Sequence, residues 1–127
     1  MTKPTLALIG TGGTIAGAAS AASVSTDYKP ASLSLAAVVD TVPELRQRYA
    51  IDVTQPMQLA SYDVRPENWL DLHAAVMHAV NNPNVAGIVV THGTDTLEET
   101  ATFLHLSVDT DKPIVVVGAM RPATAYS

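Results

Sequence analysis

The sequence predicts an α/β fold in which a doubly wound parallel sheet carries helices on both faces. Short aliphatic runs alternate along the chain with amphipathic, helix-like segments, in the order β-α-β-α-β-α-β. Apolar residues make up 47% of the chain but aromatic residues only 5%. The core must therefore consist mainly of aliphatic side chains, as in sheets that are covered on both faces.

The first third of the chain contains a strand, a loop and a helical segment. Residues 5–9 form an apolar run that ends at glycines, which is typical of a buried strand. Residues 16–25 are mostly Ala and Ser, and we expect a mobile loop there. Residues 33–42 have helical periodicity that Pro43 is expected to end, and residues 44–49 add a further turn or two.

The middle of the chain contains a second strand and the clearest helix. Residues 51–59 alternate roughly as a strand, in which Pro56 indicates a bulge or an edge position. Residues 66–80 form an amphipathic helix, with Pro66 at the first helical position. The polar residues 81–84 are expected to close this helix.

The last third adds two strands and a helix. Residues 85–90 form a nearly continuous aliphatic strand, which we expect to be buried on both faces. Residues 97–106 form a short helix, whose dipole favours Glu98 and Glu99 in its first turn. Residues 114–117 form a fourth strand.

Composition excludes several classes of partner. The formal net charge of −5 argues against nucleic acid and against an anionic membrane. The chain has no cysteine, which removes disulfides, thiolate metal sites and cysteine nucleophiles. The apolar run near the start is too short for a signal peptide, so the prediction is a soluble, cytoplasmic protein. A mature exported form with an added Met would look similar.

Four polar clusters follow the four predicted strands. They cover residues 10–14, 60–63, 91–96 and 118–122. In open α/β sheets ligands bind at the carboxyl ends of the strands, so these clusters are expected to converge on one rim. This convergence is the main signal for a functional site.

The first cluster combines a glycine pair with a hydroxyl. Gly12 and Gly13 permit tight turns and leave N–H groups for an anion or an oxyanion. A dinucleotide-binding turn is the alternative, but Ile15 stands where that pattern needs its third glycine. Thr14 supplies a candidate nucleophile, which needs a neighbour to accept its proton. Tyr28 is the candidate neighbour, although a structural threonine and a solvated tyrosine are the alternatives.

The third cluster is the most specific. Thr94 offers a second hydroxyl, and the Asp95 carboxylate can bind a substrate ammonium group. Thr91 and Thr96 are expected either to satisfy loop backbone groups or to cap the following helix. His92 has no partner at metal-ligand spacing and is predicted to pack and to form hydrogen bonds; no metal is predicted.

The chain closely resembles the bacterial-type L-asparaginase and glutaminase-asparaginase family. The resemblance is carried by residues 11–17 (TGGTIAG), 90–100 (VTHGTDTLEET) and 117–122 (VGAMRP), and it runs essentially from end to end. It implies hydrolysis of the side-chain amide of L-asparagine, with L-glutamine as a further candidate substrate, and no cofactor. It also implies that residues 1–127 are a partial amino-terminal catalytic domain.

The resemblance implies roles for particular residues. The threonine that matches Thr14 is the favoured nucleophile, and it forms a β-acyl-enzyme that is hydrolysed to aspartate. Tyr28 lies on a mobile lid and assists it, while Thr94 positions water or activates the carbonyl, and which threonine attacks first has been debated. Asp95 holds the α-amino group and Ser61 the α-carboxylate.

The remaining site residues lie beside these groups. Gly13 and Gly93 are expected to border the bound substrate, and backbone N–H groups near Thr94 to stabilise the oxyanion. Tyr62 stands where many members carry Gln or Glu, so the Asn-versus-Gln preference is left open.

Family members are over twice as long as this chain. The resemblance therefore implies that a lysine paired with Thr94 and a smaller carboxy-terminal domain lie beyond Ser127. It also implies a homo-oligomer, a dimer or a homotetramer, in the complete enzyme. Two alternatives stay open: a catalytically incomplete chain that only binds amino acids or assists assembly, and a nucleotide-binding fragment.

Overall fold

A computed structural model describes residues 2–19, 28–29 and 31–124. In chain order the elements are β1 (Thr5–Gly10), η1 (Thr14–Ala16), β2 (Ala18–Ala19), β3 (Tyr28–Lys29), α1 (Leu35–Asp40), α2 (Pro43–Arg48), β4 (Ala50–Thr54), η2 (Ser61–Asp63), α3 (Pro66–Asn81), β5 (Val85–Thr91), α4 (Leu97–Ser107) and β6 (Ile114–Val117).

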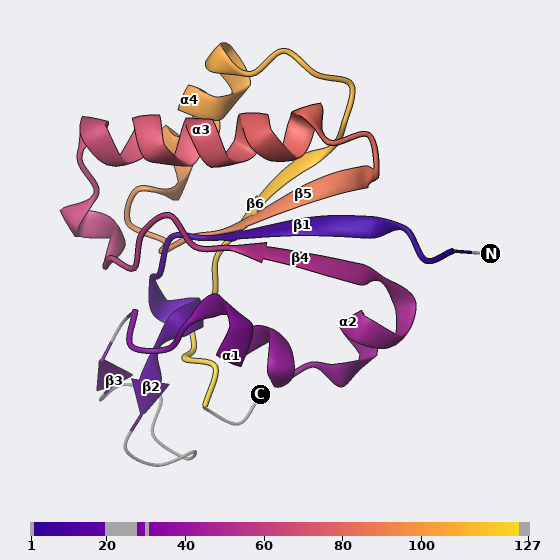
Figure 1. The fold of residues 1–127 in the computed structure, drawn as a ribbon. Coiled ribbons are helices and arrows are strands. Elements are labelled where there is room, and N and C mark those ends of the chain that lie inside the picture. The colour runs from indigo at the N-terminus through magenta and orange to yellow at the C-terminus, as the bar shows by residue number, and fades with distance from the viewer. Residues whose placement is uncertain (1, 20–27, 30, 125–127) are drawn as a thin grey trace.

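Four strands form one parallel sheet in the order β4-β1-β5-β6 (Figure 1). The short helices α1 and α2 lie on one face of this sheet, and α3 and α4 lie on the other (Figure 1). The predicted doubly wound parallel sheet with helices on both faces is therefore confirmed. Because all four strands run the same way, their carboxyl ends share one rim.

The central strand β1 is buried by both helical layers. Ala7 and Ile9 face α3, whereas Leu8 between them faces α1. Burial of an aliphatic side chain such as Ile9 contributes about 1.5–3 kcal/mol. The larger cluster consists of Ala7, Ile9, Leu72, Val76, Ala79, Val85, Ile88, Val90 and Leu104, and the smaller of Leu8, Leu35 and Val39. This two-sided packing holds the carboxyl end of β1 rigidly under the rim.

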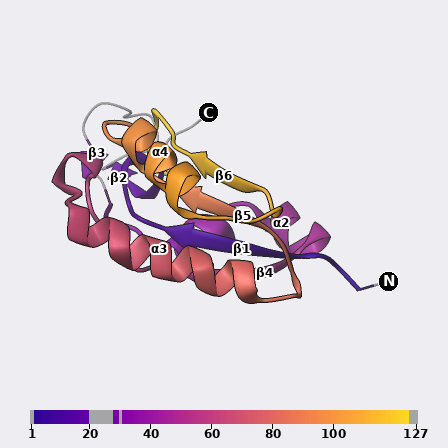
Figure 2. The ribbon, with the colours of Figure 1, turned by 90° about the horizontal axis from the view of Figure 1, so that it is seen from above.

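The long helix α3 is held at both ends. Pro66 occupies its first turn, and the side-chain oxygen of Asn68 accepts a hydrogen bond from the Arg65 N–H at 2.8 Å. At the other end, Lys112 Nζ donates to the carbonyl of Val80 at 2.8 Å. Figure 2 shows α3 and α4 lying over the same face of the sheet. Among the described residues, no helix is long and apolar enough to cross a bilayer.

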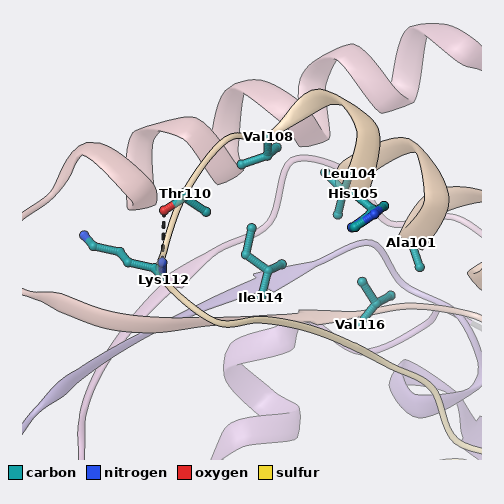
Figure 3. Close-up of a pocket in the computed structure, with 8 residues that line it drawn as sticks. All are labelled: Ala101, Leu104, His105, Val108, Thr110, Lys112, Ile114 and Val116. Atoms are coloured by element: carbon teal, nitrogen blue, oxygen red, sulfur yellow. Dashed lines mark hydrogen bonds between the residues drawn. The ribbon is translucent and has the colours of Figure 1, made fainter.

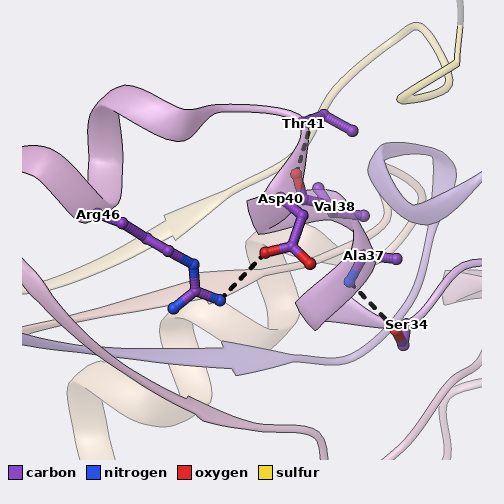
Figure 4. Close-up of polar contacts among 6 residues, drawn as sticks. All are labelled: Ser34, Ala37, Val38, Asp40, Thr41 and Arg46. Atoms are coloured by element: carbon purple, nitrogen blue, oxygen red, sulfur yellow. Dashed lines mark hydrogen bonds and ion pairs between the residues drawn. The ribbon is translucent and has the colours of Figure 1, made fainter.

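The opposite face carries two shorter helices. The Ser34 hydroxyl caps α1, and Thr41 Oγ1 donates to the Val38 carbonyl at 2.6 Å where α1 ends (Figure 4). Arg46 of α2 forms an ion pair with Asp40 of α1 at 3.2 Å, between two exposed side chains (Figure 4). Such a pair orients the two helices but adds little stability.

Three sequence predictions need correction. The second strand ends at Thr54 rather than at residue 59, and β4 lies at an edge of the described sheet as Pro56 had indicated. The helical segment predicted over residues 33–42 spans only Leu35–Asp40 and ends at Thr41, before Pro43. Pro43 instead begins α2, because proline fits a first helical position.

The described part of the mobile loop that was expected at residues 16–25 contains regular structure. Its described part holds the end of η1 and the strand β2, which pairs with β3 in a two-stranded antiparallel sheet. Two-residue strands leave no periodic signal in the sequence, so this pairing was not predictable. The rest of that prediction, residues 20–25, lies outside the described residues.

Candidate active site

Parallel pairing joins the first and third polar clusters at the rim. Gly10 of β1 lies opposite Thr91 of β5 in the sheet register. One residue further on, Thr11 donates to the Thr91 carbonyl twice, from its N–H at 3.0 Å and from its hydroxyl at 2.9 Å. The fourth cluster joins through β6, since the His92 N–H donates to the Val117 carbonyl at 2.8 Å.

Glycines allow three of the four clusters to touch. Gly12 and Gly13 have φ angles of 106° and 77°, which side chains disfavour. A Cβ on Gly13 would lie 2.4 Å from the Cα of Gly93, and a Cβ on Gly93 would lie 2.5 Å from Ser61 Oγ. The backbones of the first and third clusters therefore meet directly, and Ser61 of the second cluster packs against them.

Thr14 begins the 3-10 turn η1, directly after this glycine pair. Both ends of the turn are braced by a later segment of the chain. The Ala31 N–H donates to the Gly13 carbonyl at 3.0 Å, and the Leu33 N–H donates to the Ala16 carbonyl at 2.8 Å. Thr14 is half-buried, and these two hydrogen bonds hold the backbone on either side of it.

Ser61 and Asp95 are paired by two reciprocal hydrogen bonds. Ser61 Oγ donates to Asp95 Oδ2 at 2.9 Å and accepts from the Asp95 N–H at 3.0 Å. Thr96 Oγ1 donates to the Ser61 carbonyl at 2.9 Å. Ser61 is only 3% exposed whereas Asp95 is exposed. The buried serine thus holds an accessible carboxylate at the rim.

Thr94 is also exposed at the rim. It lies beside the carboxyl end of β6, because a Cβ on Gly118 would lie 3.1 Å from Thr94 Cγ2. The absence of a side chain at position 118 leaves room for Thr94. The two predicted hydroxyl-bearing residues, Thr94 and Thr14, thus each adjoin one member of the Gly13–Gly93 contact.

His92 is buried behind the rim, 1% exposed, and both of its ring nitrogens are bonded. Nδ1 lies 2.7 Å from the Gly93 carbonyl, which only accepts, so Nδ1 carries the proton. Nε2 then accepts from the Thr100 hydroxyl at 2.8 Å, and Thr100 accepts from Trp69 Nε1 at 3.0 Å.

Burial lowers the pKa of His92 below its ordinary value of 6.5, because the charged imidazolium is poorly solvated there. The neutral ring fits this hydrogen-bond pattern, because its Nε2 can accept from the Thr100 hydroxyl. The predicted packing and hydrogen-bonding role of His92 is therefore confirmed. Within the described part of the chain, no group of three or more His, Cys, Asp or Glu residues is arranged to hold a metal ion.

The two candidate tyrosines differ in what the structure places. Tyr62 follows Ser61 and is 63% exposed, and its carbonyl accepts a hydrogen bond from Arg65 at 3.1 Å. The backbone of Tyr28 pairs with Ala19 across the two-stranded sheet. The Tyr28 side chain lies outside what the structure describes, so its predicted approach to Thr14 stays a prediction.

A cavity of about 320 Å³ lies away from the rim, between α4 and β6 (Figure 3). Its lining consists of Ala101, Leu104, His105, Val108, Thr110, Lys112, Ile114 and Val116. None of the predicted site residues lines it. The Lys112 ammonium points away from it (Figure 3), toward the end of α3. The chemistry-bearing groups therefore do not lie in this cavity.

Sequence reasoning left the role of Thr96 open and missed two supports of His92. Thr96 was expected either to cap α4 or to satisfy a loop backbone group. It does the second, because its hydroxyl donates to the Ser61 carbonyl and its side chain forms no cap on α4. Thr100 and Trp69 were not recognised as supports of His92, because their spacing along the sequence carries no local signal.

Comparison with known proteins identifies the relatives of this chain. The family described as "Asparaginase, N-terminal" matches residues 5–127. "Probable L-asparaginase 1" of Schizosaccharomyces pombe is 48% identical over 98% of this chain and 34% of its own length. A glutaminase-asparaginase of Pseudomonas fluorescens is 49% identical over 94% of this chain and 33% of its own length.

A solved structure shows the same architecture. The crystal structure of a probable cytoplasmic L-asparaginase from Campylobacter jejuni superposes with a TM-score of 0.90 and 38% identity, over 99% of this chain and 38% of that chain. A probable periplasmic L-asparaginase of Haemophilus influenzae is 44% identical. The chain spans about a third of the length of the curated relatives it matches.

Proposed function

The chain belongs to the asparaginase family, and we propose on that basis that it is the site-bearing, amino-terminal part of an amidohydrolase. The reaction proposed is hydrolysis of the side-chain amide of L-asparagine to L-aspartate and ammonia. L-Glutamine is the second candidate substrate, because several relatives are named glutaminase-asparaginases.

One observation carries the proposal beyond family membership. The backbones of Gly13 and Gly93 are in contact, and Gly93 packs against the side chain of Ser61, so the polar clusters that follow β1, β4 and β5 meet at one point. A threonine adjoins each of the two glycines, and Ser61 holds the Asp95 carboxylate beside them. A hydroxyl nucleophile, a second hydroxyl and an anion for a substrate ammonium group are the groups that hydrolysis of an amino-acid amide requires.

In the proposed mechanism the Thr14 oxygen attacks the side-chain amide carbon. Its proton leaves with the amide nitrogen as ammonia, assisted by Tyr28, and an aspartyl ester of Thr14 remains. Water positioned by Thr94 then cleaves the ester, which releases aspartate and restores the hydroxyl. Backbone N–H groups at the rim stabilise the oxyanion, each contributing about 3 kcal/mol.

The binding roles follow from charge and position. Asp95 is proposed to bind the α-ammonium group. Ser61 is proposed to bind the α-carboxylate by turning toward it the hydroxyl proton that it donates to Asp95 in this structure. Gly13 and Gly93 are proposed to border the substrate, because they directly precede Thr14 and Thr94 at the point where the clusters meet. Tyr62 extends from the same loop into solvent, where it is placed to contact the substrate from outside.

The domain and assembly proposals rest on relative length. Because the matched relatives are about three times longer, residues 1–127 are proposed to be part of an amino-terminal catalytic domain that further chain completes. A homodimer or homotetramer is proposed for the whole protein. Named relatives include a cytoplasmic and a periplasmic form, and a cytoplasmic location is our proposal for this one.

The test is ammonia release by the purified full-length protein, with L-asparagine, L-glutamine and no substrate as parallel samples. Release that depends on L-asparagine supports the proposal, and its absence overturns it. The isolated 127-residue chain forms a second arm. If that chain binds L-asparagine without releasing ammonia, residues 1–127 are a binding part that needs the rest of the protein. Native mass measurement of the full-length protein tests the assembly.

A further inference from the structure

Two glutamines after β4 occupy an unusual position relative to the Thr14 turn. Gln58 Nε2 donates to the Ala31 carbonyl at 2.6 Å and to the Leu33 carbonyl at 3.3 Å. Ala31 and Leu33 are the residues whose N–H groups brace the two ends of η1. One side-chain amide therefore donates hydrogen bonds to both residues that hold the turn in place.

Hydrogen-bond chemistry determines how this amide is oriented. Both carbonyls only accept, so the NH2 group of Gln58 must face them and its oxygen must face away. That oxygen accepts from Gln55 Nε2 at 3.2 Å. The Gln55 oxygen in turn accepts from the Leu35 N–H at 2.8 Å, at the start of α1. The two glutamines thus form a chain of hydrogen bonds that runs from Leu35 of α1 to Ala31 and Leu33.

Ala31 and Leu33 need this support because the backbone conformation of Ala31 is disfavoured. Ala31 has a φ angle of 52°, in the left-handed region that L side chains rarely adopt. Both of its backbone polar groups are bonded, the N–H to Gly13 and the carbonyl to Gln58. Gly12 closes the arrangement, since a Cβ there would lie 2.9 Å from the Ala31 Cβ and 2.4 Å from the Leu59 carbonyl oxygen.

We propose that Gln58 is a positioning residue for Thr14, which it orients through Ala31 and Leu33. The hydrogen bonds of Gln58 go to Gln55, Ala31 and Leu33, so it acts on the geometry of the turn rather than on the rim. This inference rests on the proposed role of Thr14 as nucleophile. A loosened turn would misplace the attacking oxygen while leaving the Ser61–Asp95 pair intact.

The test compares Gln58→Glu with the native full-length protein. Because the Gln58 side chain is exposed, the variant should fold. The carboxylate that replaces the amide has no N–H to donate to the two carbonyls. We expect kcat for L-asparagine to fall roughly three- to tenfold near pH 8, because one or two modest hydrogen bonds are lost. KM should change less than about twofold. The partners of position 58 are two carbonyls and an amide, none of which titrates. Lowering the pH toward the range of a protonated glutamate should therefore restore a donor and raise the variant-to-native activity ratio.

Gln47→Glu is the matched control, because it makes the same change at an exposed position of α2. Its activity ratio should stay near one at every pH. Hydrogen exchange supplies a readout besides activity: the Ala31 and Leu33 amides should exchange faster in Gln58→Glu and not in Gln47→Glu.

Two failures are distinguishable. A native protein that releases no ammonia overturns the proposed function. The exchange measurement alone then decides whether Gln58 holds Ala31 and Leu33 in place. An active native enzyme whose Gln58→Glu variant matches the Gln47→Glu control in activity and exchange overturns only this inference. A drop in kcat that is independent of pH, with faster exchange throughout the chain, also overturns it, because that pattern reports general destabilisation.

Discussion

The hydroxyl of Ser61 and the carboxylate of Asp95, 34 residues apart, orient one another through two hydrogen bonds of 2.9 and 3.0 Å. Because Ser61 is buried and Asp95 is accessible, the serine acts as the fixed support and the carboxylate as the exposed group.

Replacing Ser61 with alanine should loosen Asp95. The Asp95 N–H and carboxylate would each lose a partner, at a cost of about 1–2 kcal/mol in the free energy of unfolding. We expect KM for L-asparagine to rise several-fold, measured by ammonia release, with a lower Tm. Ser107→Ala, at an exposed position, is the control. Unchanged KM in Ser61→Ala would show that the pairing does not matter for binding.

Replacing Asp95 with alanine should mainly weaken substrate binding. A lost charge-assisted hydrogen bond is worth about 1.5–3 kcal/mol, so KM for L-asparagine should rise roughly ten- to a hundredfold. Succinamate is the same amide without the α-amino group, and its kinetics should respond much less to the change. If the two substrates lost activity equally, Asp95 would not bind the ammonium group.

Replacing Thr14 with alanine should remove turnover but not folding. Loss of a nucleophile lowers kcat by at least about a thousandfold, while calorimetry should still detect L-aspartate binding. Thr102→Ala, an exposed threonine of α4, controls for the substitution itself. Near-native turnover in Thr14→Ala would move the nucleophile to Thr94.

His92 should make stability depend on pH. Burial lowers its pKa in the folded state, so the unfolded state binds the proton more readily below the ordinary value of about 6.5. Its contribution is therefore complete above pH 6.5 and is lost as pH falls through the folded-state pKa, with a slope of at most about 1.4 kcal/mol per pH unit.

The measurement is the free energy of unfolding against pH for the native protein and His92→Gln. Glutamine can still accept from Thr100 but does not titrate, so the variant should have a shallower loss of stability between pH 7 and 5. His78→Gln, at an exposed position of α3, should keep the native slope. Identical slopes in all three proteins would contradict this account of the buried imidazole.

The sheet and its helices were predictable because their signals are local. The aliphatic run at residues 5–9, the helical spacing after Pro66 and the glycines after β1 each report on a few neighbouring residues. The convergence of the polar clusters also followed, since parallel strands share a carboxyl edge. These local signals were enough to predict the helices and strands and the edge of the sheet at which the polar clusters lie.

Tertiary structure alone decided which of these polar groups are partners. The Ser61–Asp95 pair spans 34 residues, the Trp69–Thr100 bond 31 and the Gln58–Ala31 bond 27. The positive φ of Ala31 and the two-residue strands β2 and β3 likewise leave no trace in composition. A hydrogen bond depends on position to within a few tenths of an ångström and on direction. Sequence patterns determine which elements form and which edge they share, whereas only the packed chain brings donors and acceptors to that precision.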